Sequence, residues 1–275
     1  MKSLAGLPLR AALLLCGALS AGCQTPLGQL QRLAGEHGRQ VESLTSAPFT
    51  LTYSAPATRP GQRLRVYLEG DGHAWATRSQ PSLDPSPRQL LVASLAFADP
   101  QSSVYLARPC QYRQTPACYA ALWTHQRYSH EVLDSLDQAL SRLKARYGNE
   151  DFELIGYSGG ATLALLLATR RDDVAQVQTL AGNLSLRRWV ALQQLSPLTG
   201  SLEPLDQRER LARVPQRHLI GAADTLITPD LLAHYRQSLE PATCLESAVL
   251  SGVEHAKGCT EARANWRSRP LSCNP

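Results

Sequence analysis

One stretch of the chain, residues 152–169, limits the possible folds more than any other. It begins with a short apolar run (FELIGY), passes through the glycine-flanked Ser158, and ends in an almost wholly apolar segment, ATLALLLAT. A short apolar run is typical of a buried strand, and a segment that is apolar on all sides is typical of a buried helix. The stretch therefore predicts a central strand that turns sharply into a buried helix.

Further strands and helices are predicted on both sides of this stretch. The other expected strands are 49–54, 63–68, 104–107, 177–181, 218–221 and 247–250. Helical patterns separate most of them, and in the clearest one Ser129 can cap the start and Gly148 the end. Such alternation favours a mostly parallel sheet with helices on both faces. We see no internal repeat or second linker, so residues 47–275 are expected to form one α/β domain.

The first 22 residues have the pattern of an export signal. Lys2 and Arg10 bracket a positive start, and residues 11–22 carry no charge but are too few to span a bilayer. Small residues then run into Cys23. This resembles a bacterial lipoprotein signal, which implies cleavage before Cys23 and a lipid on its sulfur.

Lipidation would anchor the protein in the bacterial envelope, and Gln24 resembles the choice for the outer membrane. Ordinary cleavage near Gly22 is the alternative. It would give a soluble periplasmic or secreted protein and leave Cys23 free for a disulfide. Residues 23–46 have only weak helical spacing and are interpreted as a tether.

The cysteines fit an exported protein, because an oxidising compartment would pair most of them. Of the seven, Cys16 and Cys23 lie at the N-terminus, and the others are Cys110, Cys118, Cys244, Cys259 and Cys273. Cys110 and Cys118 are close in sequence, so we expect a disulfide between them, with one of the last three left over. If Cys23 carries no lipid, six cysteines can pair evenly.

Composition and motifs exclude several other classes of function. Hydrophobic residues make up 43% of the chain and charged residues 19%, which suits a folded protein with a sizeable core. The net charge of +5, without a run of basic residues, does not point to nucleic acid. There is no zinc-ligand spacing, P-loop or dinucleotide fingerprint, so neither a metal nor a cofactor is expected.

The five residues GYSGG at 156–160 match the pattern G-x-S-x-G. In the turn between a strand and a helix, this pattern forces the serine into strained backbone angles and lifts its hydroxyl clear of the sheet. The helix N-terminus behind it provides positive potential for an anion. Ser158 is therefore a candidate nucleophile. The alternative is that Ser158 only caps the helix.

A nucleophilic serine needs a base, and the base needs a group that orients it. His255 follows the last predicted strand and Asp224 follows the strand at 218–221, so both belong to loops at the carboxyl ends of strands. We assign His255 as the base and Asp224 as the acid. Glu254 is a weaker rival, because adjacent side chains point apart.

The order Ser158, Asp224, His255, each after its own strand, resembles the α/β-hydrolase superfamily. The resemblance spans residues 49–255 and is carried by GYSGG, HLIGAADTLITP and GVEH. Within the superfamily the chain is similar to exported bacterial hydrolases of undefined substrate. The resemblance implies a mainly parallel eight-stranded sheet and acyl transfer in two steps.

The same resemblance implies an oxyanion hole built from the backbone N–H groups of Gly159 and Asp71. Many relatives have His-Gly after the strand at 63–68, whereas this chain has Glu69-Gly70-Asp71-Gly72. Two carboxylates would oppose a developing negative charge unless they are paired. We expect Arg108 to pair with Glu69. The alternative is that both acids bond to backbone within loops.

The expected function is a cofactor-free serine hydrolase, like a carboxylesterase or thioesterase, that cleaves a small carboxylic ester or thioester. Candidates for the substrate pocket are Trp75, Trp123 and Arg108, although the tryptophans could equally be structural. An acyltransferase with the same triad is one alternative. A surface-anchored binding lipoprotein without catalysis is the other. No protein partner is predicted.

Overall fold

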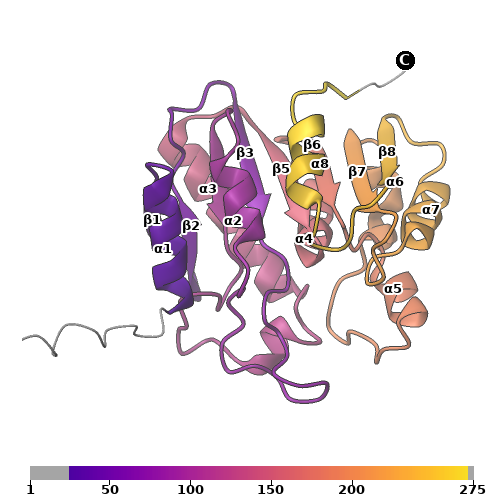
Figure 1. Cartoon of the computed structure of the whole chain (residues 1–275), viewed down its shortest axis with the longest axis horizontal. Coiled ribbons are helices and arrows are strands. Elements are labelled where there is room, and N and C mark those ends of the chain that lie inside the picture. The colour runs from indigo at the N-terminus through magenta and orange to yellow at the C-terminus, as the bar shows by residue number, and fades with distance from the viewer. Residues whose placement is uncertain (1–24, 272–275) are drawn as a thin grey trace, which may run out of the picture.

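One eight-stranded sheet organises the part of the chain that the structure, a computed structural model, describes: residues 25–271 (Figure 1). Its order is β1-β2-β4-β3-β5-β6-β7-β8. The strands are β1 (Val41–Ser46), β2 (Phe49–Ser54), β3 (Arg63–Leu68), β4 (Ser103–Leu106), β5 (Asp151–Tyr157), β6 (Val174–Leu180), β7 (Gln216–Gly221) and β8 (Leu245–Leu250). Only the β1–β2 and β2–β4 pairs are antiparallel, so the predicted, mostly parallel sheet is confirmed.

The segment at 23–46 is not a tether, because it belongs to the fold from residue 26 onward. The helix α1 (Pro26–Glu36) is capped by Thr25, whose side chain accepts from the N–H of Gly28. Strand β1 then pairs along its whole length with β2 and forms one edge of the sheet. The signal pattern at 1–22, Cys23 and Gln24 lie outside the described residues.

Helices cover both faces of the sheet (Figure 1). The helices α2 (Leu91–Phe97) and α8 (Cys259–Trp266) share one face with α1. The other face carries α3 (His130–Tyr147), α4 (Gly159–Ala168), α5 (Leu186–Leu192) and α7 (Pro229–Ser238), and the connections include α6 (Arg208–Leu211) and two 3-10 turns, η1 (Ala120–Trp123) and η2 (Pro204–Gln207). Helix α8 was not predicted from the sequence.

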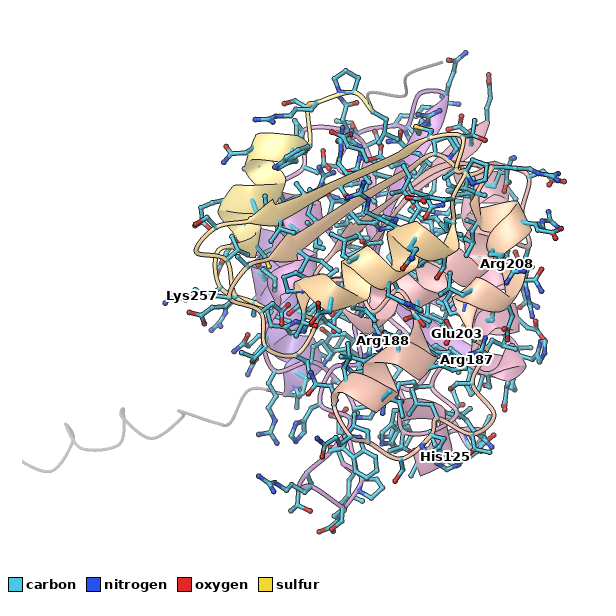
Figure 2. The ribbon with its side chains drawn as sticks, turned by 90° about the vertical axis from the view of Figure 1, so that its right-hand side faces the viewer. His125, Arg187, Arg188, Glu203, Arg208 and Lys257 are labelled. Carbon is cyan, nitrogen blue, oxygen red and sulfur yellow. A yellow bond between two sulfur atoms is a disulfide. The ribbon has the colours of Figure 1, made fainter. Side chains whose placement is uncertain are left out.

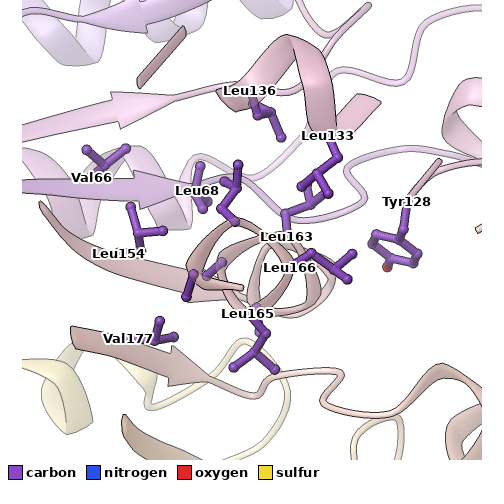
Figure 3. Packing of buried hydrophobic residues seen from close by; sticks show 14 of the residues in the cluster. Val66, Leu68, Tyr128, Leu133, Leu136, Leu154, Leu163, Leu165, Leu166 and Val177 are labelled. Atoms are coloured by element: carbon purple, nitrogen blue, oxygen red, sulfur yellow. The ribbon is translucent and has the colours of Figure 1, made fainter. Parts of the chain in front are cut away.

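Helix α4 is the centre of the larger core, because every one of its residues is buried. Figure 3 shows its leucines, including Leu163, Leu165 and Leu166, surrounded by side chains from the sheet and from α3. Loss of one such fully buried leucine to alanine costs about 2–5 kcal/mol of folding free energy. The helix that follows Ser158 is thus held firmly in place.

The cysteines divide between bonded and free. Cys110 and Cys118 form the expected disulfide, which closes part of the loop after β4. Cys244 is also disulfide-bonded, whereas Cys259 is a free, buried thiol. Cys16, Cys23 and Cys273 fall outside the described residues. Between residues 25 and 271 no helix combines the length and apolar character needed to cross a bilayer.

Candidate active site

Ser158 lies in the sharp turn between β5 and α4. Its φ of 51° and ψ of −119° are strained for a residue with a side chain. The turn also requires its flanking glycines. A Cβ on Gly156 would overlap the backbone of Ala161, and a Cβ on Gly160 would overlap the carbonyl of Leu68. The geometry is that expected for G-x-S-x-G and places the serine at the carboxyl edge of the sheet.

The structure brings Ser158, His255 and Asp224 together in one hydrogen-bonded chain. His255 Nε2 lies 3.1 Å from Ser158 Oγ, and His255 Nδ1 lies 2.8 Å from Asp224 Oδ2. The other carboxylate oxygen of buried Asp224 accepts from the backbone N–H groups of Leu226 (2.9 Å) and Ile227 (2.8 Å). A proton can therefore move from the serine to the imidazole while the carboxylate fixes the ring.

The loop that carries His255 is held from two sides. The hydroxyl of Tyr157, next to the serine, donates to the backbone oxygen of His255 at 3.2 Å, and the two rings lie 5.3 Å apart. The thiol of Cys259, at the start of α8, donates to the same oxygen at 3.2 Å. Both contacts fix the backbone of the histidine. Neither contact was predicted from the sequence.

Asp71 is clamped by two arginines and a tyrosine. Arg108 and the hydroxyl of Tyr128 (2.9 Å) donate to one carboxylate oxygen, and Arg127 donates to the other at 2.5 Å. Burial disfavours the ionised form, but the charges of Arg127 and Arg108 outweigh it and lower the pKa of Asp71 to about 2. The expected pairing of Arg108 with Glu69 is therefore wrong: Arg108 pairs with Asp71.

Glu69 is buried beside this clamp but forms no ion pair with any residue between 25 and 271. Its carboxyl accepts from the hydroxyl of Tyr105 and from the N–H of Gly70, both at 2.8 Å. Burial raises the pKa of Glu69 to about 7, although these two hydrogen bonds and the charge of Arg108 oppose the shift. Glu69 thus follows the alternative reading, a carboxyl turned into the loop and bonded there.

The two predicted oxyanion donors border one cavity above Ser158. Gly159 packs directly against Asp71, since a Cβ on Gly159 would overlap the Asp71 carboxylate and the hydroxyl of Tyr128. Within residues 25–271 no hydrogen bond occupies the backbone N–H of either Gly159 or Asp71. Both residues line the cavity.

This cavity has a volume of about 1290 Å³. It is lined by Ser158, by His255 and, from the loop that carries Asp224, by Leu226 and Ile227. Of the pocket candidates, Trp75 lines it. Trp123 does not, because it is buried and its indole N–H donates to the backbone oxygen of Ser82 at 3.1 Å. Arg108 does not line it either, since the Asp71 clamp occupies it. Figure 2 shows the lining residue His125 among the loops at this end of the molecule.

The cavity is also lined by residues that were not predicted from the sequence. They include Arg78, Arg88, Trp189, Leu195, Leu198 and Leu226. In the sequence they stand out only as apolar or charged residues after strands. The sequence pattern does not show which of these residues face the cavity. Across the described ranges, no three His, Cys, Asp or Glu side chains gather as metal ligands would.

Comparison with known proteins identifies the fold. No protein-family model and no curated protein sequence matches the chain. Among solved structures, an esterase of Pyrococcus furiosus superposes with a TM-score of 0.65 at 12% identity, over 86% of this chain and 90% of that one. The acylaminoacyl peptidase of Pyrococcus horikoshii gives 0.60 at 12%, over 82% of this chain and 39% of that one.

A serine hydrolase homologue from Coxiella burnetii superposes with a TM-score of 0.55 at 14% identity, over 82% of this chain and 94% of that one. These neighbours, together with the strand order and the turn at Ser158, show that the chain has the α/β-hydrolase fold.

Proposed function

We propose that this chain, with its α/β-hydrolase fold, is a serine hydrolase that cleaves a carboxylic ester or thioester through an acyl-enzyme. The observation that carries the proposal is the hydrogen-bonded chain from Ser158 through His255 to Asp224, set at the wall of a large cavity. A serine hydroxyl becomes a useful nucleophile when a base of this kind removes its proton. The esterase and serine hydrolase among the similar structures support the same chemistry.

In the first half of the proposed reaction, Ser158 Oγ attacks the acyl carbon while its proton passes to His255 Nε2. Asp224 holds the imidazole in the required tautomer and stabilises the imidazolium that forms. The tetrahedral intermediate collapses as His255 returns the proton to the departing alcohol or thiol. The ester bond breaks, and the acyl group stays on Ser158.

In the second half, His255 takes a proton from a water molecule, and the resulting hydroxide attacks the acyl carbon. The acid leaves, and the proton returns to Ser158. The N–H groups of Gly159 and Asp71 are proposed to hold the oxyanion in both halves, where each such donor typically contributes about 10²–10³ in rate.

The charges beside the proposed oxyanion hole support this role. The Asp71 carboxylate is bound by two guanidinium groups, so that this cluster of one anion and two cations has an excess of positive charge. Glu69 is the other acid nearby, and burial holds its pKa near 7, so much of it is uncharged in neutral solution. The two carboxylates therefore oppose a developing oxyanion far less than their number suggests.

The proposal is tested with a fluorophosphonate probe and a set of chromogenic substrates. The probe should label the wild type and not Ser158→Ala, with both proteins unfolding at the same temperature. A butyrate ester and its thioester should be hydrolysed, while a matched amide serves as the peptidase control. A correctly folded wild type that neither reacts with the probe nor turns over any of the three would refute the proposal.

Export and lipidation at Cys23 are proposed on the signal pattern alone. Cells grown with a clickable fatty acid should yield labelled wild-type protein and unlabelled Cys23→Ala. Mature wild-type protein that begins near residue 23 but carries no lipid would instead support ordinary cleavage and a soluble periplasmic or secreted enzyme.

A further inference from the structure

The cavity above Ser158 has two unlike ends. The sheet order places β5, which ends at Ser158, between β3 on one side and β6 and β7 on the other. The segments that follow β6 and β7 contribute apolar lining, notably Trp189, Leu195, Leu198 and Leu226. One end of the cavity therefore suits a hydrocarbon group.

The loop that follows β3 contributes a mixed lining, in which Trp75 and Pro87 are apolar and two arginines are charged. It brings Arg78 and Arg88 to the cavity, and both side chains are exposed. Neither guanidinium group makes an ion pair or a hydrogen bond with any group in residues 25–271. The planar fork of an arginine side chain matches carboxylate and phosphate oxygens.

No acid in the cavity wall is available to balance these two charges. Among the described residues, the lining acids are Glu69 and Asp71. Asp71 is already bound by two other arginines, Arg108 and Arg127. Glu69 is buried and bonded to Tyr105 and Gly70, with a pKa that burial raises to about 7. Arg78 and Arg88 thus meet no free acid among the described residues that line the cavity.

We propose that the cavity binds an ester with two unlike arms. One arm is apolar and lies against Leu195, Leu198 and Leu226. The other arm carries a negative charge on oxygen and lies within reach of Arg78 and Arg88. The reacting bond joins the two arms above Ser158. This inference rests on the proposed hydrolase function for its chemistry, but the binding preference is a separate property of the cavity. It names the substrate class as an amphiphilic, negatively charged ester.

The kinetic test uses two matched pairs of esters. In the first pair, phenyl butyrate carries a 3-carboxylate or a 3-carboxamide on the leaving group. In the second, the phenyl monoester of glutaric acid is compared with its terminal carboxamide, so that the charge sits on the acyl arm. The ester bond and the apolar part are kept within each pair. The uncatalysed hydrolysis of every ester is subtracted, because a carboxylate also alters the leaving group or attacks its own ester.

Wild-type kcat/KM should favour the anionic member of one pair about tenfold at low salt, which corresponds to two partly exposed charge contacts. The ratio should fall to about one in the double variant Arg78→Ala/Arg88→Ala, and it should shrink in 1 M salt. The matched control is Arg188→Ala/Arg208→Ala, which removes two arginines outside this cavity (Figure 2). It should keep the wild-type ratio. A wild-type ratio of one or less in both pairs would overturn the proposal.

A binding measurement separates this inference from the proposed function. Ser158→Ala is titrated by calorimetry with both members of each pair, so that no turnover is needed. Tighter binding of an anionic member, lost in the Arg78→Ala/Arg88→Ala background, supports the inference even if the wild type hydrolyses nothing. If the esters are hydrolysed without any preference for charge, in binding or in turnover, the proposed hydrolase function stands and the proposed anionic substrate is refuted.

Discussion

The two flanks of Ser158 are built in opposite ways. On one flank, Asp224 is held by backbone N–H groups two and three residues further along its own loop. On the other, Asp71 is held by Arg108, Arg127 and Tyr128, whose positions lie 37, 56 and 57 residues away in the sequence. The first flank is organised locally, and the second depends on a long loop folding back over the strand end.

This difference separates reactivity from stability. Asp224 accepts hydrogen bonds from neutral backbone donors. A neutral side chain of the same shape at this position therefore leaves no buried charge without a partner. Asp71 balances two guanidinium groups that are nearly buried, so its loss leaves cations in a medium that solvates them poorly. We therefore expect changes on the Asp224 flank to affect turnover and changes on the Asp71 flank to affect folding.

The largest expected effect is that of Asp224→Asn on turnover. Asparagine can still accept from Leu226 and Ile227, but its amide group disfavours the required tautomer of His255. We expect kcat/KM for a butyrate ester to fall by about 10⁴-fold, with the thermal midpoint almost unchanged. A loss of turnover that is matched by a loss of stability would show that this flank is structural after all.

Asp71→Asn should instead lower the free energy of unfolding much more than it lowers turnover. It removes the counter-charge of Arg108 and Arg127, and breaking a buried pair of this kind typically costs about 3–5 kcal/mol. Urea unfolding at pH 7 measures it. The matched control is Asp134→Asn, which breaks the exposed pair with Arg170 and should cost no more than about 1 kcal/mol. Equal costs for the two variants would mean that solvent reaches the Asp71 cluster freely.

Glu69 and Asp71, the two carboxyls of the Asp71 flank, should change the stability of the fold with pH in opposite directions. The pKa of Asp71 lies below its ordinary value of 3.8, so its contribution to stability is present above pH 4 and is lost as the pH falls towards 2. The pKa of Glu69 lies above its ordinary value of 4.5 because of burial. The unfolded state therefore ionises first, and stability is lost as the pH rises from about 4.5 to 7.

Glu69→Gln removes the loss of stability that the ionisation of Glu69 causes as the pH rises. The variant should gain stability over the wild type between pH 5 and pH 8, by up to about 3 kcal/mol, in urea unfolding followed across that range. Below pH 4 the difference between the two proteins should stop changing. A difference that is constant from pH 4 to 8 would show that folding leaves the pKa of Glu69 at its ordinary value.

The same contrast explains what the sequence could predict. The turn at Ser158, the strands before Asp224 and His255, and the order of the three residues are local patterns, and the structure reproduces their placement. The Asp71 clamp was predicted only in part. Arg108 was expected near these acids as the partner of Glu69, but nothing in the sequence near Asp71 indicates that Arg127, 56 residues away, also binds it. The edge strand β1 was missed for a related reason. Its burial pattern is mixed, and only pairing with β2 makes it a strand.

The smallest expected effects come from removing one hydroxyl on each flank. Tyr157→Phe loses the bond to the backbone oxygen of His255, but Cys259 still donates to that oxygen and the ring contact remains. We expect a cost of about 1 kcal/mol, seen as a several-fold lower kcat with little change in KM. Tyr128→Phe loses a bond to the charged Asp71 carboxylate, so its cost in unfolding should be about twice as large, with kcat less affected.

Measuring the free energy of unfolding and kcat for both variants decides whether the division between the flanks extends to single hydroxyl groups. If Tyr128→Phe slows turnover more than Tyr157→Phe does, the Asp71 flank takes a direct part in the reaction, and its clamp sets the position of the oxyanion donor as well as the stability of the fold.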